Sequence, residues 1–212
     1  MGRPRTPVGT GRPALRAWSG GLRGLWRAAL RLDQELFERA ARRRSPLLDL
    51  ALPRLTGLAD HGVLWMAVAG GLALAGGPRG RRAAGRGLVA LAITSALANQ
   101  LGKRSFGRRR PALDDVPLGR RARHVPISAS FPSGHAASAA AFATTVGATI
   151  PAAAVPVGAL AAGVAYSRVH TGVHYPGDVL GGVLLGAAVG LLVASRARGS
   201  AGRRAISPGR RR

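Results

Sequence analysis

From residue 47 onwards the chain alternates long apolar runs with short stretches rich in arginine. Apolar runs that approach the ~20 residues needed to cross a bilayer as a helix are typical of membrane proteins. The pattern therefore predicts an all-α fold, a polytopic membrane helical bundle with five or six transmembrane helices. The five spans are expected at roughly 62–77, 87–101, 133–150, 151–166 and 179–195, with the shorter ones extending into their flanks.

A further apolar run, 47–58, is short and contains Pro53 and Arg54. It is interpreted as an interfacial or re-entrant segment, and it is also the candidate for the sixth span. Glycine and alanine are frequent within all these runs. Small residues of this kind suit close helix packing, because contacts between helices in lipid depend on them.

A different pattern precedes the apolar runs. Between residues 14 and 44, leucine, tryptophan and phenylalanine recur at helical spacing with arginines between them. This predicts an amphipathic helix, or a pair of helices, at the membrane surface. A solvated helix that packs on its own domain fits the same periodicity. Residues 1–13 are rich in Pro, Gly and Arg and are expected to be disordered.

The expected organisation is a basic tail with an amphipathic helix at 1–45, one transmembrane domain at 46–195 and a basic cytoplasmic tail at 196–212. The formal net charge of +24 lies mostly in the two tails. Charge placed in this way is typical of segments that flank membrane spans. We therefore expect membrane lipids as partners and no nucleic acid, although basic patches also bind nucleic acid. The chain has no cysteine, so disulfides and thiolate metal sites are excluded.

The arginines in the loops predict which side of the membrane each loop faces. The loop 77–86 and the tail after residue 195 are basic, and cytoplasmic loops carry excess positive charge. Alternating spans then place 101–132 and 168–178 together on the outer side of a plasma membrane. The loop 101–132 is itself basic, which departs from the rule, and its charge has a chemical explanation.

The first cluster of chemical interest is Lys103, followed by six residues and then Arg110 and Pro111. Lys103 is the one lysine in a chain whose other basic residues are all arginine. A compact ammonium and a planar guanidinium bind phosphate differently, so this exception indicates a specific point charge. Taken alone, the cluster is more typical of the positive flank of a membrane helix than of a phosphate site.

The second cluster is Pro132-Ser133-Gly134-His135, directly before an alanine-rich run. It would place backbone N–H groups, a hydroxyl and an imidazole at a helix N-terminus, where partial positive charge attracts an anion. This arrangement predicts a phosphate cradle. An ordinary serine N-cap with an incidental histidine is the competing interpretation.

The third cluster lies in the stretch SRVHTGVHYPGD, residues 167–178. His174 and Asp178 are four residues apart, so in a helical turn the carboxylate can orient one imidazole nitrogen and leave the other free to attack phosphorus. Arg168 lies nearby as a cation. Because ionisable groups at the edge of a membrane are usually functional, we expect these residues to act on a substrate.

The three clusters, in this order, resemble the signatures of the type 2 phosphatidic acid phosphatase (PAP2) superfamily of membrane phosphatases. The resemblance runs from Lys103 to Asp178 and implies that the signatures meet at one site at the membrane face. It implies that His174 is the nucleophile, Asp178 its orienting partner and His135 the general acid. It further implies that the phosphate is bound by Lys103, Arg110, Arg168, Ser133 and the backbone of Gly134. Gly172 would allow close approach of the chain.

Which of Arg108, Arg109 and Arg110 reaches the phosphate is left open by the sequence. No metal and no cofactor are expected, because cations and histidines converge here and a divalent metal would call for several carboxylates.

The function expected from these features is hydrolysis of a lipid phosphomonoester or pyrophosphate, such as a polyprenyl pyrophosphate or phosphatidate, through a phosphohistidine. A phosphotransferase within the same superfamily is an alternative. A non-catalytic basic membrane protein that binds anionic lipid or nucleic acid is a further one. The natural lipid and the oligomeric state are not determined by the sequence.

Overall fold

The computed structural model describes residues 13–104, 107–114, 116–122, 125 and 127–205, without the side chains of 13–22, 101–104 and 197–205. Its described part is helical and contains no strand, which confirms the predicted fold class. The helices and 3-10 turns are α1 (Pro13–Arg42), α2 (Pro46–Ala59), η1 (Asp60–Gly62), α3 (Val63–Ala75), α4 (Gly77–Arg104), η2 (Leu118–Arg120), α5 (Gly134–Thr149), η3 (Pro151–Ala153), α6 (Ala154–His170) and α7 (Pro176–Ala205). Residues 1–12, expected to be disordered, lie outside the described part.

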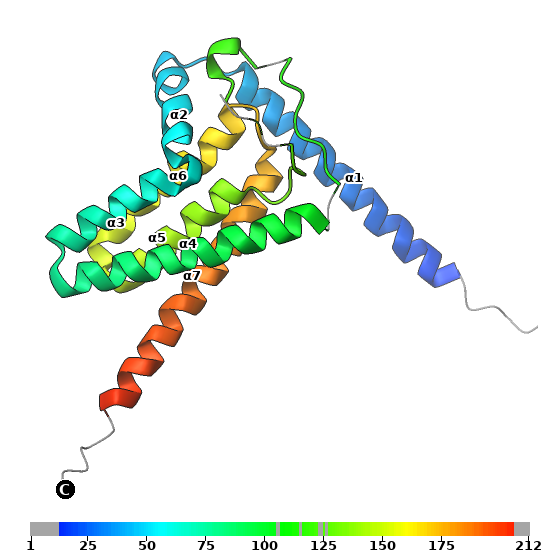
Figure 1. Ribbon diagram of the computed structural model, residues 1–212. Helices are drawn as coiled ribbons and strands as arrows, with labels where there is room; N and C mark the ends of the chain where they lie inside the picture. The colour runs from blue at the N-terminus through cyan, green and yellow to red at the C-terminus, as the bar shows by residue number, and fades with distance from the viewer. Residues whose placement is uncertain (1–12, 105–106, 115, 123–124, 126, 206–212) are drawn as a thin grey trace, which may run out of the picture.

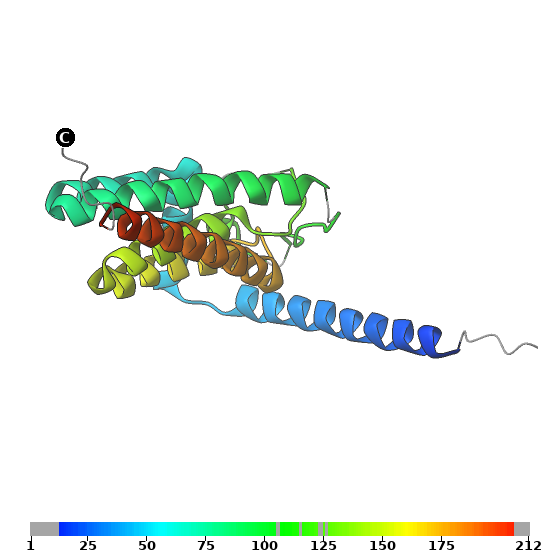
Figure 2. The ribbon, with the colours of Figure 1, turned by 90° about the horizontal axis from the view of Figure 1, so that it is seen from below.

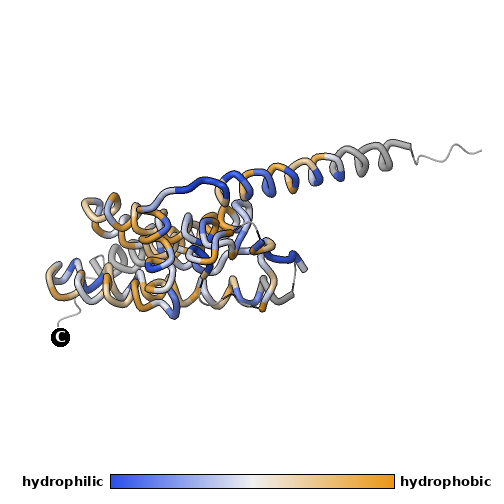
Figure 3. The backbone as a smooth tube through the Cα atoms, turned by 90° about the horizontal axis from the view of Figure 1, so that it is seen from above, coloured by the Kyte–Doolittle hydropathy of each residue, from blue (hydrophilic) through white to orange (hydrophobic). Residues whose placement is uncertain are grey.

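Helix α5 is the centre of the bundle and packs against α4, α6 and α7, while α3 forms a hairpin with α4 (Figure 1). The main core gathers around the rings of Trp65 and Phe142, whose centroids are 5.1 Å apart, and includes Val146 and Val164. Colouring by hydropathy shows that apolar residues dominate the helices of the bundle (Figure 3). Because lipid tails are as apolar as these side chains, this core stabilises the bundle mainly through van der Waals packing between helices.

The contact between α5 and α7 is close because three glycines of α7 face α5. A Cβ atom on Gly182 or Gly186 would lie 2.4 Å from the carbonyl oxygen of Ser133 or 2.0 Å from that of Ala137. On Gly190 it would lie 2.8 Å from the carbonyl oxygen of Ala141. The prediction that small residues mediate helix packing is confirmed here. The close contact also brings the N-termini of α5 and α7 together, and both carry predicted site residues.

The N-terminal segment forms a single helix, α1, and not a pair. Its C-terminal half packs on the bundle through Phe37 and Ala41, which contact Val116 and Val169. Figure 2 shows the rest of α1 extending beyond the bundle. The position of α1 at a membrane surface stays a prediction, as does the division of the chain into tails and a central domain.

The segment between α4 and α5 is tied to the N-terminal helices by Arg120. This arginine is 2% exposed and donates to the carbonyl oxygens of Ala41, at 3.0 Å, and Arg43, at 2.7 Å. It also forms an ion pair with Asp49. A buried cation with this many partners holds its segment firmly, because removal of one partner leaves an uncompensated charge.

Within the described residues, three helical segments are long and apolar enough to cross a membrane: Pro46–Ala75, Pro151–His170 and Pro176–Arg196. The predicted spans at 87–101 and 133–150 are helical but fall outside this set, because α4 carries arginines in its first half and α5 has only 16 residues. The short run 47–58 forms α2, which joins α3 through a kink at η1. The number of spans stays a prediction.

Candidate active site

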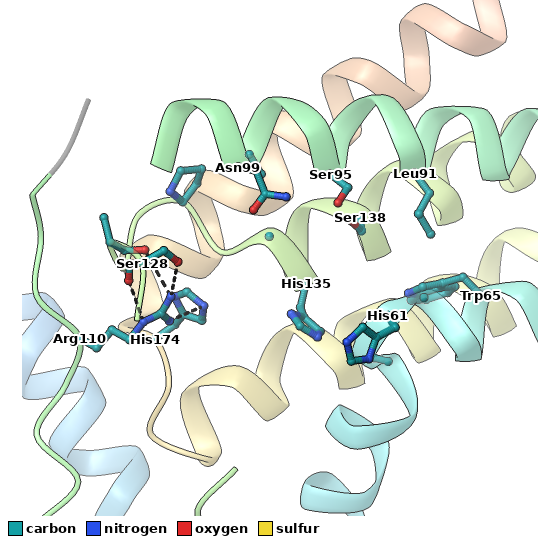
Figure 4. Close-up of a pocket in the computed structure, with 16 residues that line it drawn as sticks. His61, Trp65, Leu91, Ser95, Asn99, Arg110, Ser128, His135, Ser138 and His174 are labelled. Atoms are coloured by element: carbon teal, nitrogen blue, oxygen red, sulfur yellow. Dashed lines mark hydrogen bonds between the residues drawn. The ribbon is translucent and has the colours of Figure 1, made fainter. Parts of the chain in front are cut away.

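The three sequence clusters meet at a cavity of about 370 Å³ at one end of the bundle. Four of the predicted site residues line it: Arg110, Gly134, His135 and His174. Figure 4 shows the two histidines facing the same space from different segments. The spatial convergence expected from the sequence is therefore present.

His174 lies in the short connection between α6 and α7, and its position depends on Gly172. The φ angle of Gly172 is +76°, in the left-handed region that favours glycine. A Cβ atom there would lie 2.8 Å from side-chain atoms of Leu113 and Val116. The chain can therefore turn sharply against the loop that follows α4, which presents the buried imidazole of His174 to the cavity.

The partners of His174 define its tautomer. Its Nε2 atom is 3.1 Å from Nη1 of Arg110. Because a guanidinium has only donors, Nε2 must accept, and the ring proton must lie on Nδ1. Nδ1 is 3.6 Å from Oδ2 of Asp178 and 3.4 Å from Oγ of Ser130. The nitrogen that faces the cation thus carries the lone pair of the ring, which accepts from Arg110.

The charge state of His174 suits a nucleophile. Burial of the ring lowers the pKa of His174 to about 4, although the hydrogen bond to Asp178 opposes the shift. The imidazole is therefore neutral at physiological pH. The neutral form is the one that can attack an electrophile.

Asp178, at the start of α7, is fully buried and accepts several hydrogen bonds. Ser130 donates its hydroxyl at 2.5 Å and the backbone N–H of Tyr175 donates at 3.0 Å, both to Oδ2. Arg108 donates to Oδ1 at 2.9 Å. A buried carboxylate needs such partners to remain ionised, and here they also fix its orientation toward His174.

The same network reaches α1 through Arg108. Nη2 of Arg108 is 2.5 Å from Oδ2 of Asp33, whose other oxygen accepts the backbone N–H of Gly177 at 2.6 Å. The guanidinium of Arg108 also lies over the ring of Tyr175, 4.3 Å from its centroid. Asp33 therefore connects the N-terminal helix to the segment that carries His174 and Asp178.

These contacts distinguish the three consecutive arginines. Arg110 lies against the reactive face of His174, whereas Arg108 bridges two carboxylates. Arg109 is exposed, and no hydrogen bond or ion pair joins it to a described residue. Burial lowers the pKa of Arg110 while Asp178 opposes this shift. Of the three, Arg110 is the one placed to meet a phosphate.

The contact with Asp33 gives a first testable prediction. In Asp33→Asn the amide oxygen can still accept from Gly177, but the charge that pairs with Arg108 is lost. We expect kcat to fall about 10-fold with little change in KM, from the strength of charged hydrogen bonds. Glu35→Gln is the matched control, because Glu35 is an exposed acid on the same helix that pairs with the exposed Arg39. Steady-state kinetics of both variants test this, and equal kcat values for the two would contradict it.

The Pro-Ser-Gly-His cluster forms the N-terminus of α5, as predicted, with Ser133 at the N-cap position. The backbone N–H of Ser133 donates to the carbonyl oxygen of Asp178 at 2.9 Å, which joins the second and third clusters. The hydroxyl of Ser133 is buried and, within the described residues, has no hydrogen-bond partner. An unpaired hydroxyl beside free helix N–H groups is suited to bind an anion.

His135 has a partner that sequence reasoning missed. Its Nε2 atom is 2.7 Å from Oδ1 of Asp60, in the turn η1. His61 and Gly62, which follow, have φ angles of 55° and 77°, so the chain bends sharply here. The bend allows the end of α2 to place Asp60 against the imidazole of His135. The ring is thus held by one nitrogen, with the other facing away from Asp60.

Three predicted phosphate ligands, Lys103, Ser133 and Arg168, are not among the residues that line the cavity. Ser133 is buried directly before the lining residue Gly134. Arg168 is buried at the end of α6, donates to the hydroxyl of Thr56, and is absent from the cavity lining. Its Nε atom has no partner among the described residues. Lys103 lies in the last turn of α4, and its side chain is outside the described part. Their predicted role in phosphate binding stays a proposal.

The residues that the sequence did not indicate are Asp33, Asp60, Ser130 and Ser128. The hydroxyl and carbonyl groups of Ser128 orient Arg110. The composition gave one indication for the two aspartates. The chain has 8 acidic residues and 32 basic ones, so any acidic residue is expected to have a basic partner. Which cation or histidine each acid meets depends on long-range packing that spacing does not encode.

Comparison with known proteins supports the fold and gives the family. The PAP2 superfamily model matches residues 84–199, which is more than half of the chain. The site and the helical bundle are those of a membrane-associated phosphatase, and the protein belongs to the PAP2 superfamily. The matched segment contains all three clusters and leaves α1 to α3 outside it.

Two curated relatives are phosphatases by name. The chain is 39% identical over 147 residues to the decaprenylphosphoryl-5-phosphoribose phosphatase of Mycobacterium tuberculosis, covering 66% of this chain and 76% of the relative. It is 36% identical over 105 residues to the lipid A 1-phosphatase of Rhizobium johnstonii, covering 48% of this chain and 43% of that relative.

Two solved structures share the fold. The first is a transmembrane PAP2 type phosphatidylglycerolphosphate phosphatase from Bacillus subtilis, with a TM-score of 0.62, 26% identity and coverage of 81% of this chain and 87% of that one. The second is Aquifex aeolicus LpxE, with a TM-score of 0.60, 26% identity and coverage of 77% of this chain and 95% of that one.

Proposed function

We propose that the protein is an integral membrane lipid phosphate phosphatase that acts through a phosphohistidine on His174. The observation that carries this proposal is the environment of that ring. One nitrogen faces Arg110 with its lone pair, and the other faces Asp178 in a buried network. This is the arrangement that a histidine nucleophile requires: oriented, neutral and next to a cation that can hold a phosphoryl oxygen.

In the first step, Nε2 of His174 attacks phosphorus and the bond from phosphorus to the leaving oxygen breaks. Arg110 moves from the ring nitrogen to the phosphoryl oxygens, with the N-terminus of α5 and the Ser133 hydroxyl as further donors. Lys103 and Arg168 are proposed to add positive charge. Phosphoryl transfer spreads negative charge over three oxygens, which positioned cations stabilise.

His135 is proposed to protonate the leaving oxygen. The Asp60 carboxylate accepts from Nε2 of this ring and holds it at the cavity, and in this proposal the ring carries the proton that the leaving oxygen receives. After the leaving group departs, His135 is neutral and can take a proton from the attacking water. That water displaces His174 from phosphorus and releases inorganic phosphate, which restores both histidines.

The substrate is proposed to be a lipid phosphomonoester or pyrophosphate. Support comes from the relatives named as phosphatases of decaprenylphosphoryl-5-phosphoribose and of lipid A, and from the apolar helices beside the site.

No metal is included in the proposal, because arginines supply the positive charge. Within the described residues no group of three His, Asp or Glu has the arrangement of a metal site. The site is proposed to face the outer side of the plasma membrane, as the arginine distribution predicts.

The direct test is an assay of the full chain, purified in detergent, with EDTA present. We expect release of inorganic phosphate from one or more of a panel that contains phosphatidate, a polyprenyl pyrophosphate and phosphatidylglycerophosphate. With ³²P-labelled substrate, a denaturing quench at alkaline pH should trap a phosphoprotein that is stable to base and loses its label in acid. Absence of phosphate release from the whole panel would refute the proposal. Label that appears on an added alcohol acceptor would identify a phosphotransferase.

The role of His135 gives a second prediction. In His135→Ala, hydrolysis of substrates with poor leaving groups, such as alkyl phosphates, should slow about 10²–10⁴-fold, because general acid catalysis supplies this factor. Hydrolysis of an aryl phosphate with an acidic phenol should slow much less, because that leaving oxygen needs no proton. Comparison of kcat/KM across a leaving-group series measures the difference. Equal slowing across the series would remove His135 from the acid role.

A further inference from the structure

A second cavity, of about 760 Å³, lies outside the active site between α1 and the start of α7. Apolar side chains of both helices line this α1–α7 groove, among them Trp26, Leu36 and Leu180. All three are exposed, so the groove is open at the surface of the protein. The start of α7 lies beside the C-terminal half of α1, and the rest of α1 extends away from the bundle (Figure 1, Figure 2).

Two charged residues, Asp33 and Arg108, line the same groove. Asp33 is buried, pairs with Arg108 at 2.5 Å and accepts the backbone N–H of Gly177 at 2.6 Å. Arg108 in turn donates to Asp178 at 2.9 Å. Two direct contacts therefore connect the groove to the carboxylate that orients His174.

The groove is continuous with the lipid-facing side of α7. This helix begins the segment Pro176–Arg196, which is long and apolar enough to cross a membrane. Leu180 and Leu184 are four residues apart, so they share one face of α7, and both are exposed. Exposed leucines of a membrane span face the hydrocarbon of the bilayer. Because Leu180 also lines the groove, a hydrocarbon chain can enter it from the bilayer.

The first half of α1 places positive charge beside the groove. The chain has no acidic residue among its first 32 residues. Arg27 follows Trp26 and Arg31 follows Leu30, and these two apolar residues both line the groove. The two arginines are exposed, and within the described residues neither pairs with an acid. Arginines of this kind beside an exposed apolar helix face are typical of helices that bind anionic lipids.

We propose that the α1–α7 groove binds an anionic phospholipid of the membrane. One acyl chain lies between Trp26 and Leu180, and the phosphate of the headgroup is bound by Arg27 and Arg31. The charge of the arginines matches an anionic headgroup, and a guanidinium is well suited to bind a phosphate through paired hydrogen bonds. The lipid is a separate ligand and not the substrate, because the groove does not include the catalytic histidines.

The bound lipid supports catalysis through α1. Its chain contacts α1 and α7 at the same time, so it holds Asp33 against Arg108 and stabilises the orientation of Asp178. Asp33 is thus a positioning residue, and occupation of the groove raises kcat. Binding of the lipid is independent of the proposed function, whereas its effect on turnover rests on that function.

Binding is tested by fluorescence quenching of the full chain in phosphatidylcholine nanodiscs, to which phosphatidylglycerol with brominated acyl chains is added. The difference in quenching between the wild type and Trp26→Phe gives the contribution of Trp26. This contribution should be large with brominated phosphatidylglycerol and small with brominated phosphatidylcholine. The double variant Arg27→Gln/Arg31→Gln should bind phosphatidylglycerol about 30-fold more weakly, from the contribution of two basic residues near an anionic surface. Equal quenching by the two brominated lipids would overturn the proposal.

The effect on turnover is the ratio of kcat in nanodiscs with phosphatidylglycerol to kcat in nanodiscs without it, measured with the best substrate of the panel. In the wild type we expect a ratio of up to about 10, the factor expected from the Asp33 contact. The ratio should be close to unity in Arg27→Gln/Arg31→Gln and in Asp33→Asn. Only Asp33→Asn should still bind the brominated lipid with wild-type affinity, because it breaks the connection and leaves the arginines in place.

Arg79→Gln/Arg82→Gln is the matched control, because it removes two exposed arginines at the start of α4, at the end of the bundle away from α1 (Figure 1). It should leave the quenching and the kcat ratio unchanged. Equal losses in this control and in Arg27→Gln/Arg31→Gln would overturn the site, and a wild-type ratio close to unity would overturn its link to catalysis. If the proposed function fails instead, no phosphate is released in either kind of nanodisc, while quenching still reports the lipid in the groove.

Discussion

His174→Ala should abolish turnover, with kcat reduced by at least about 10⁴-fold, and should leave the protein folded in the membrane. The physical reason is that no second group can replace the attacking nitrogen. The ring of His135, which shares the cavity, is held by Asp60 at 2.7 Å. Removal of a nucleophile from a catalytic unit typically has effects of this size or larger.

The measurement for His174 combines kinetics with trapping of the intermediate. No acid-labile phosphoprotein should form in His174→Ala, while thermal unfolding in detergent stays close to that of the wild type. Asp178→Asn is the informative companion, because it preserves the shape of the side chain but weakens the orientation of the ring. It should retain some labelling at a reduced rate. Normal labelling of His174→Ala would place the nucleophile elsewhere.

Arg110→Ala should reduce kcat/KM about 10²–10³-fold, which is typical when one preorganised group that stabilises transition-state charge is removed. Arg110 is placed for this role by contacts with Ser128, Ala129 and Val173, which hold its guanidinium against His174. The matched control is Arg109→Ala, which removes an equal charge from the adjacent position. Because Arg109 is exposed, its loss should change kcat/KM less than about 3-fold.

Comparison of Arg110→Ala with Arg109→Ala separates positioned charge from general positive charge in the loop. The assay should be repeated at low and high salt, because bulk electrostatic attraction is screened while a direct contact is not. The difference between the two variants should persist at high salt. Equal losses in both variants would show that the loop acts only through its net charge.

Much of the local structure was predictable from the sequence. Apolar runs indicated most helices of the bundle, and the Pro-Ser-Gly-His cluster was correctly expected to begin a helix. The expectation of a loop at 77–86 was wrong, because α4 begins at Gly77. The run 47–58, which was interpreted as interfacial or re-entrant, forms the helix α2. The four-residue spacing of His174 and Asp178 was sufficient to expect their contact. Features of this kind depend on backbone periodicity and on residues close in the chain, which the sequence encodes directly.

The choice among the three consecutive arginines could not be made in the same way. Arg108, Arg109 and Arg110 lie in an irregular segment, where no periodicity predicts direction. Its path is determined by distant contacts, such as those of Arg120 with Ala41 and Arg43. The position of Arg168 could not be predicted for the same reason, because its contact with Thr56 joins residues far apart in the chain.

By itself, the sequence determined the helical membrane fold and the superfamily, because these are encoded in composition, in the order of the motifs and in short spacing. It also predicted which two histidines and which carboxylate form the candidate site. Only the tertiary structure decided that Asp33 of α1 supports the Arg108–Asp178 pair and that Asp60 holds His135. Such contacts form when helices pack, and the free energy of packing depends on the whole bundle and not on any one segment.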